Sequence, residues 1–131
     1  MLRASVFIGT SVDGFIARRN GDLDFLPPGG GEPHGYNEFM ASIDTLVIAG
    51  GNGTRAAAQE PALVRFVAKC GAKARRVASV CSGAYILAAT GLLDGRVATT
   101  HWTRSADFAL KFPRVKVDAD RIFVKEGKYW S

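Results

Sequence analysis

Residues 76–89 carry the pattern that decides the fold: Arg-Val-Ala-Ser-Val-Cys-Ser-Gly-Ala-Tyr-Ile-Leu-Ala-Ala. An apolar run typical of a β-strand ends at Cys81, and small and apolar residues typical of a helix follow at once. A strand that turns sharply into a helix at a nucleophile is a nucleophile elbow, which holds that side chain above the sheet edge. Free N–H groups at the helix start would favour a thiolate and could hold an oxyanion. The alternative is a buried, inert cysteine at a strand end.

Two further strand ends carry residues with chemical potential. The strand predicted over 44–49 is followed by Gly50 and Gly51, and the stretch 97–100 is followed by His101. A continuous apolar run such as 44–49 suits a parallel strand buried on both faces. Ligands bind beyond the carboxyl ends of strands in an open parallel sheet, so these residues should converge on Cys81.

The remaining pattern predicts an alternation of strands and helices. Helices are expected over 36–43, from Pro61 to about Cys70 with Gly71 ending it, over 81–90 and over 105–111. Short strands over 115–117, 121–124 and 128–130 predict a small antiparallel meander. This order predicts one α/β domain over residues 1–131, with a mainly parallel sheet.

Each candidate residue has a definite role in a thiol mechanism. Cys81 would be the nucleophile and His101 the group that activates it, because an imidazole within hydrogen-bond reach accepts the thiol proton. The backbone N–H groups of Gly51 and Ser82 would be oxyanion donors, and Gly50 would let the backbone approach a substrate closely. The alternative for His101 is a strand-end histidine whose ring bonds to the backbone. His34, in a Gly/Pro-rich loop, is expected to be a surface or helix-entry residue.

Composition excludes several classes of protein. The chain has 131 residues, 47% of them hydrophobic, and a net charge of +5. It has no apolar run near the ~20 residues of a membrane span, and no signal-peptide pattern at its start, so we expect a cytoplasmic protein. The basic cluster of Lys69, Lys73, Arg75 and Arg76 is read as a solvated helix end. A nucleic-acid patch is the alternative, although no binding motif surrounds it.

Metal and cofactor sites are not expected. The chain has two cysteines and two histidines, and none of them shows the paired short spacing of a metal site. The segment Gly50–Gly53 lacks the spacing of a dinucleotide fingerprint.

Several segments together resemble the PfpI / class I glutamine amidotransferase-like superfamily. They are 44–51, 78–84, 89–96, 98–102 and 117–127. The branch that they most resemble is the amidase-like sensor domain of AraC-type transcriptional regulators, with isonitrile hydratases nearby. The resemblance implies a flavodoxin-like three-layer sandwich, Cys81 as nucleophile with His101 close to it, and oxyanion donors at Gly51 and Ser82.

Residues 1–48 instead resemble the N-terminus of bacterial dihydrofolate reductase-like proteins, through segments 6–17, 21–26 and 36–40. The chain therefore reads as a chimera with a seam near 44–50. In many PfpI relatives the replaced loop supplies an acidic partner to the cysteine. Asp13, Asp22 and Asp24 are the candidate substitutes here, and no matched motif supports any of them. The PfpI-like segment, 44–131, also looks truncated at its end, and an open sheet face would favour a homodimer.

Four functions follow from these patterns. The first is a cysteine-dependent hydrolase or hydratase acting on a small electrophilic substrate without a cofactor. The second is a non-catalytic ligand-sensing domain; no helix-turn-helix segment accompanies it, so this chain alone should not bind nucleic acid. The third is a nicotinamide-dependent reductase, and the fourth is a recombinant chimera without evolved activity.

Overall fold

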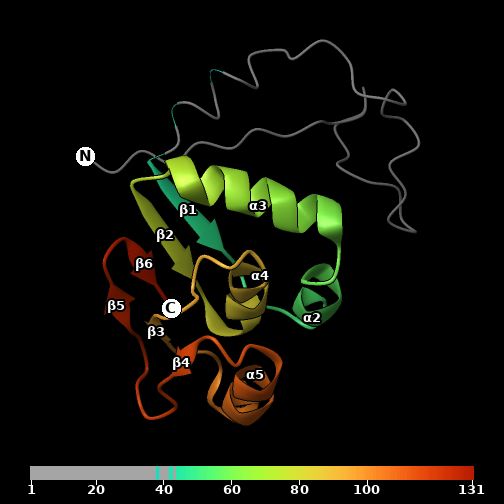
Figure 1. The fold of residues 1–131 in the computed structure, drawn as a ribbon, viewed down its shortest axis with the longest axis vertical. Helices are drawn as coiled ribbons and strands as arrows, with labels where there is room; N and C mark the ends of the chain where they lie inside the picture. The colour runs from blue at the N-terminus through green and yellow to red at the C-terminus, as the bar shows by residue number, and fades with distance from the viewer. Residues whose placement is uncertain (1–37, 39–41, 43) are drawn as a thin grey trace, which may run out of the picture. The chain divides into compact units, whose positions relative to one another are not determined.

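The computed structural model describes residues 38, 42 and 44–131 (Figure 1). The chain divides into two compact units, 1–42 and 43–131, and all the elements below belong to the second. Glu38 and Ser42 are helical, in line with the helix predicted over 36–43. The dihydrofolate reductase-like segments, the three candidate aspartates and His34 otherwise lie outside the described residues.

Four strands form one mainly parallel sheet in the order β1-β2-β6-β5. Strand β1 (Thr45–Ile48) pairs parallel with β2 (Arg76–Ser79), and β2 pairs parallel with β6 (Tyr129–Trp130). Strand β5 (Lys125–Glu126) is antiparallel to β6. A separate parallel pair joins β3 (Val97–Ala98) to β4 (Lys116–Val117). Together with the helices between the strands, this arrangement confirms the predicted α/β class.

The helices occupy the connections between these strands. They are α2 (Thr54–Ala57), α3 (Pro61–Lys73), α4 (Ala84–Ala89), α5 (Ser105–Lys111) and the 3₁₀ turns η1 (Cys81–Gly83) and η2 (Trp102–Arg104). Helix α3 begins where predicted, with Pro61 in its first turn and the Glu60 side chain accepting a hydrogen bond from the Ala62 N–H at 3.3 Å. Helix α2 was not predicted, because four residues are too few to show a helical period.

Helix α4 is the centre of the core. All its residues from Ala84 to Ala88 are buried. A helix that is apolar all round is typical of a buried position, and its small residues let its neighbours approach. The Tyr85 ring packs against Phe108, with centroids 5.0 Å apart, and against Phe112 at 5.9 Å. The elbow is therefore built on the most deeply buried helix of the described region.

Two details of the predicted elements are wrong. Helix α3 continues through Gly71 to Lys73. Gly71 is buried, and a Cβ there would lie 2.8 Å from Leu92 Cδ1, so the glycine allows close packing rather than ending the helix. Strand β1 is not buried on both faces, since Val47 is 60% exposed. Only Ile48 of that strand is buried, and β1 lies at the edge of the described sheet.

The predicted antiparallel meander is smaller than expected. Residues 121–124 form no strand, and β4 pairs in parallel with β3, so within residues 44–131 only the β5–β6 hairpin is antiparallel. Side chains link this hairpin region to β3: Glu126 Oε2 accepts the Val97 N–H at 2.6 Å, and Ser131 Oγ accepts the Thr99 N–H at 2.8 Å.

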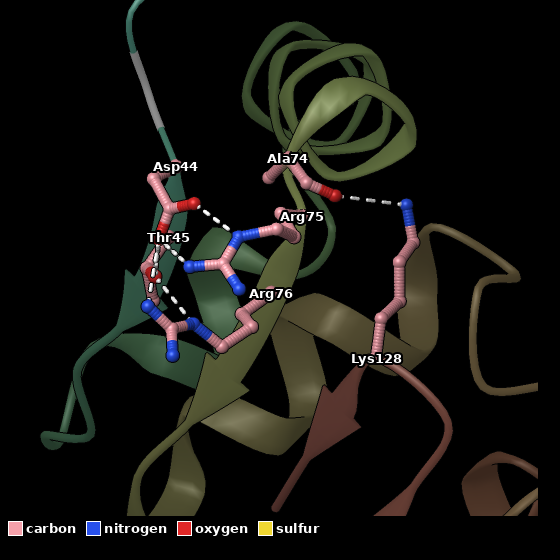
Figure 2. Close-up of polar contacts among 6 residues, drawn as sticks. All are labelled: Asp44, Thr45, Ala74, Arg75, Arg76 and Lys128. Atoms are coloured by element: carbon pink, nitrogen blue, oxygen red, sulfur yellow. Dashed lines mark hydrogen bonds and ion pairs between the residues drawn. The ribbon is translucent and has the colours of Figure 1, made fainter.

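Charged side chains join the start of the sheet to the end of α3 (Figure 2). Asp44, before β1, pairs with Arg75 at 2.5 Å and with Arg76 at 2.8 Å. The hydrogen bond from Arg75, and then that from Arg76, hold the pKa of the Asp44 carboxyl well below its usual range. Two of the four cluster cations are thus paired with a carboxylate.

Lys128 completes the C-terminal end of α3. Its Nζ donates hydrogen bonds to the carbonyls of Gly71 (2.8 Å), Ala72 (3.0 Å) and Ala74 (3.1 Å). The last carbonyls of a helix have no partner within the helix, so a cation from the segment just before β6 satisfies them and complements the helix dipole. Figure 2 shows the contact with Ala74.

We expect Lys128→Met to lower the free energy of unfolding by about 1–2 kcal/mol, because three carbonyls lose a charged donor. Lys69→Met, on the exposed side of the same helix, is the matched control and should change stability little. Denaturant melts of both variants measure the difference, and equal losses would contradict the capping role.

Candidate functional site

Cys81 sits at a strained bend between β2 and η1. Its φ is +55°, and it is the only non-glycine residue with positive φ in the described part of the chain. Left-handed backbone is uncommon for residues other than glycine and collects at functional sites. The Cys81 side chain is exposed. The predicted elbow is therefore present in the backbone, and the alternative of a buried cysteine does not hold at this position.

Two glycines let the end of β1 lie directly against this bend. A Cβ on Gly50 would be 2.8 Å from Cys81 Cβ and 2.8 Å from the Val80 carbonyl oxygen. A Cβ on Gly83 would be only 2.3 Å from the Ile48 carbonyl oxygen. Real Cβ atoms do not come this close, so any side chain at either position would force the backbones apart. Gly50 thus acts behind the thiol, as a packing residue of the elbow.

The two predicted oxyanion donors differ in their availability. The Gly51 N–H donates to Ser82 Oγ at 3.0 Å, and Ser82 Oγ donates to the Gly51 carbonyl at 3.1 Å. The Ser82 N–H makes no hydrogen bond within residues 44–131, as expected at the start of a 3₁₀ turn. The described structure therefore leaves the Ser82 N–H free, while the Gly51 N–H is available only if the serine hydroxyl moves.

His101 lines the same cleft as Cys81. This cleft has a volume of about 430 Å³, and Gly51 and Ser82 also line it. A hydrogen bond from Thr100 Oγ1 to the Cys81 carbonyl, at 3.0 Å, ties the segment before His101 to the elbow. Cleft volumes of this order suit small molecules. Four of the five predicted site residues therefore meet in one cleft, and their chemical roles stay predictions.

Thr103 occupies one nitrogen of the His101 ring. Nδ1 of His101 lies 2.8 Å from Thr103 Oγ1, and the Thr103 N–H donates to the same nitrogen at 3.3 Å. The Thr103 N–H can donate only to a bare Nδ1, so it favours the tautomer with the proton on Nε2. In the tautomer with the proton on Nδ1, the ring keeps only its bond to the Thr103 hydroxyl, which then accepts. In both tautomers Nε2 is the ring nitrogen that remains to exchange a proton with a substrate or with Cys81. The Trp102 ring stacks beside the imidazole, with centroids 5.8 Å apart.

Sequence reasoning missed six further residues of the cleft, namely Asn52, Thr54, Arg55, Tyr85, Thr103 and Arg104. Arg55 comes soon after the Gly50–Gly53 loop, and Arg104 comes three residues after His101. Both arginines therefore follow the carboxyl ends of strands, and this position could have identified them as cleft residues. The Tyr85 hydroxyl donates to Asp107 Oδ2 at 2.7 Å. Burial, and then this hydrogen bond, raise the pKa of Tyr85 to about 12.

The other cysteine is not part of the cleft. Cys70 is 4% exposed inside α3, and burial raises the pKa of its thiol. Among the described residues, no three His, Cys, Asp or Glu side chains gather in a way that could hold a metal ion. No helix in the described ranges has the length and apolar character needed to cross a membrane.

Comparison with known proteins identifies relatives of the described region. Residues 36–129 match the model of the DJ-1/PfpI family. An uncharacterized protein in the cpoL 5' region of Streptomyces lividans is 45% identical over 73 residues, which are 56% of this chain and 52% of that protein. The isonitrile hydratase of Pseudomonas putida is 40% identical over 60 residues, 46% of this chain and 26% of the enzyme. The chain thus spans about half or less of the length of these relatives.

A third relative matches across the predicted seam. The HTH-type transcriptional regulator GbdR of Pseudomonas aeruginosa is 28% identical over 122 residues, which are 92% of this chain and 31% of the regulator. A match of that extent includes most of the residues before Asp44. It gives residues 1–43 a counterpart in one known protein, while their dihydrofolate reductase-like resemblance stays a prediction.

Solved structures agree with these relatives. A THiJ/PfpI family protein from Pseudomonas syringae superposes with a TM-score of 0.59 at 36% identity, covering 66% of this chain and 35% of that one. A cysteine-to-alanine mutant of a DJ-1 superfamily protein from Salmonella typhimurium gives a TM-score of 0.55 at 28% identity, covering 72% of this chain and 50% of that one.

We expect Gly83→Ala to destabilise the protein by about 3 kcal/mol or more, because the new methyl overlaps the Ile48 carbonyl. Gly53→Ala is the control, since a Cβ there meets nothing within 4 Å and φ is −79°. The control should be neutral or slightly stabilising. Denaturant midpoints compare the two, and similar midpoints would refute the proposed close contact.

The Tyr85 phenol should titrate late and couple to stability at alkaline pH. Its pKa is raised in the fold, so its contribution is complete below the ordinary value of 10 and is lost as pH rises towards about 12. Tyr85→Phe should remove the latest step in tyrosinate absorbance and flatten the fall of unfolding free energy over that range. An unchanged absorbance profile in the variant would contradict this assignment.

Proposed function

The chain belongs to the DJ-1/PfpI family, and on that premise we propose that it carries a cysteine-dependent hydrolase or hydratase site with Cys81 as the nucleophile. The observation that carries the proposal is the exposed thiol at a left-handed bend, on a cleft that His101 also lines. Backbone strain at an exposed nucleophile is typical of catalytic elbows. The relative named isonitrile hydratase supports the same chemistry at this site.

In the proposed reaction, His101 reacts in the tautomer with its proton on Nδ1, donated to Thr103 Oγ1, so that the bare Nε2 accepts the thiol proton, directly or through one water. The Nδ1–H of the resulting imidazolium keeps its bond to Thr103 Oγ1. The thiolate attacks the carbonyl carbon of an amide or aldehyde, and the Ser82 N–H holds the charge that develops on the oxygen. With an isonitrile the thiolate attacks the terminal carbon instead, and the imidazolium protonates that carbon to give a thioimidate, which water then hydrolyses. For an acyl substrate, the imidazolium protonates the leaving group as its bond to carbon breaks. A water then attacks the thioester, with His101 accepting its proton and the thiol regained.

Acyl transfer to Cys81 tests this proposal with nitrophenyl acetate as the probe. The wild-type protein should release a burst of nitrophenolate equal to the protein present, with the acetyl group on Cys81 by mass spectrometry, followed by slower turnover. His101→Gln should lower the burst rate by about 10²-fold or more, the usual contribution of a base. Cys70→Ala is the control and should keep the burst.

Alkylation by iodoacetamide gives an independent reading of the thiol. Cys81 should react faster than Cys70 in the folded protein and faster than the same residue in denaturant. A Cys81 that reacts no faster when folded, together with no acetyl-enzyme, would sink the catalytic proposal.

The second candidate is a ligand-sensing domain that does not turn over. The observation in its favour is the match to GbdR, which is named as an HTH-type transcriptional regulator and covers 92% of this chain. Such a domain would keep the cleft and the small-molecule ligand. In the acetate experiment it would give an acylated Cys81 without turnover, or no acylation at all.

Other expectations stay proposals of lower rank. A homodimer, a cytoplasmic location and an engineered or evolved join near residues 44–50 rest on sequence pattern alone. The function as a nicotinamide-dependent reductase rests on the resemblance of residues 1–48 to dihydrofolate reductase-like proteins. Measured binding of a reduced nicotinamide cofactor would support that function.

A further inference from the structure

Two arginines line the cleft around Cys81. Arg55 reaches it from α2 and Arg104 from η2, and both are exposed. Neither side chain forms an ion pair with any described residue, although five other cation–carboxylate pairs occur in residues 44–131. In the same part of the chain, no Asp or Glu lines the cleft. The described walls nearest the thiol thus carry two cations and no anion.

The carboxylate that interacts with Tyr85 in the wall of the cleft is already partnered. Asp107 accepts the Tyr85 hydroxyl at 2.7 Å and pairs with Lys111 at 3.3 Å. Lys111 lies one helical turn along α5, so this pair is neutral as a unit. Arg55 also attracts the Asp107 carboxylate, as the weakest of the contributions that lower the pKa of Asp107. Neither arginine donates a side-chain hydrogen bond within residues 44–131, so their guanidinium N–H groups remain for a ligand.

We propose that the cleft selects small carboxylate-bearing molecules, with Arg55 and Arg104 binding the carboxylate while an electrophilic carbon of the same molecule faces Cys81. The guanidinium group suits this role because its planar fork matches a carboxylate with two parallel hydrogen bonds. A volume of about 430 Å³ holds a compound of a few carbons together with its anionic group. The inference deepens the proposed function by naming a substrate class, and it rests on that function for the role of Cys81.

A pair of alkylating probes isolates the charge preference. Iodoacetate and iodoacetamide have nearly the same size and lose the same iodide when the sulfur–carbon bond forms, but only iodoacetate is anionic. The measured quantity is the ratio of their rate constants at Cys81, by peptide mass spectrometry, relative to the same ratio for mercaptoethanol. We expect the ratio at Cys81 to favour iodoacetate by about fivefold over the free thiol, the factor that 1 kcal/mol provides. Added salt should reduce this preference, because it screens exposed charges.

Substitutions assign the preference to the two side chains. Arg55→Gln and Arg104→Gln should each lower the ratio, and the double variant should bring it to the free-thiol value. Arg55→Lys and Arg104→Lys keep the charge and should retain most of the preference. Arg65→Gln, an exposed residue of α3 outside the cleft, removes the same charge elsewhere and should leave the ratio unchanged. Unchanged circular dichroism and melting temperature show that each variant is folded.

The outcomes separate this inference from the proposed function. Slow alkylation by both probes, with the ratio still favouring iodoacetate, would remove the activated nucleophile but keep the carboxylate site. Fast alkylation with a ratio equal to that of mercaptoethanol would overturn the carboxylate site and keep the nucleophile. A preference that survives the double substitution would also overturn it, because the charge would then come from elsewhere.

Discussion

The contact between the end of β1 and the turn after β2 is the constraint on which the site depends. Gly83 lies so close to the Ile48 carbonyl, and Gly50 so close to Cys81, that both positions exclude any side chain. Parallel pairing of β1 with β2 brings these segments to the same sheet edge. The bend at Cys81 is then held in a left-handed conformation that an isolated chain would rarely adopt. The thiol is exposed because the backbone beneath it cannot relax.

The segment after β3 completes the cleft by attaching to the elbow rather than to the sheet alone. The Thr100 hydroxyl donates a hydrogen bond to the Cys81 carbonyl, and the Thr103 hydroxyl bonds to Nδ1 of the His101 ring. Both threonines follow the end of β3. Side-chain hydroxyls therefore set the position of the imidazole, where backbone pairing has already ended. One half of the site, the elbow at Cys81, is therefore held by backbone packing. The other half, the segment that carries His101, is held by a few side-chain hydrogen bonds.

Short sequence patterns predicted those parts of the fold that are determined by residues close together in the chain. The apolar strand, the thiol and the small-residue helix identified the elbow, and the strand ends predicted that Gly51, Ser82 and His101 would share a cleft with Cys81. What sequence could not provide was pairing over long separations. Strand β4 joined β3 in parallel, and Gly71 packed on Leu92 inside α3, because partners far along the chain decided both. The two arginines of the cleft were missed because exposed cations have no periodic signal.

The hydrogen bonds that Glu126 and Ser131 make to β3 have a consequence for association between molecules. A short strand pair with free N–H groups is an open template on which another chain can add a strand. Here the Val97 and Thr99 donors are already taken by side chains of the hairpin region. The β3 edge of the second sheet is therefore already occupied by the hairpin region, so another chain could add a strand to this sheet only at its β4 edge.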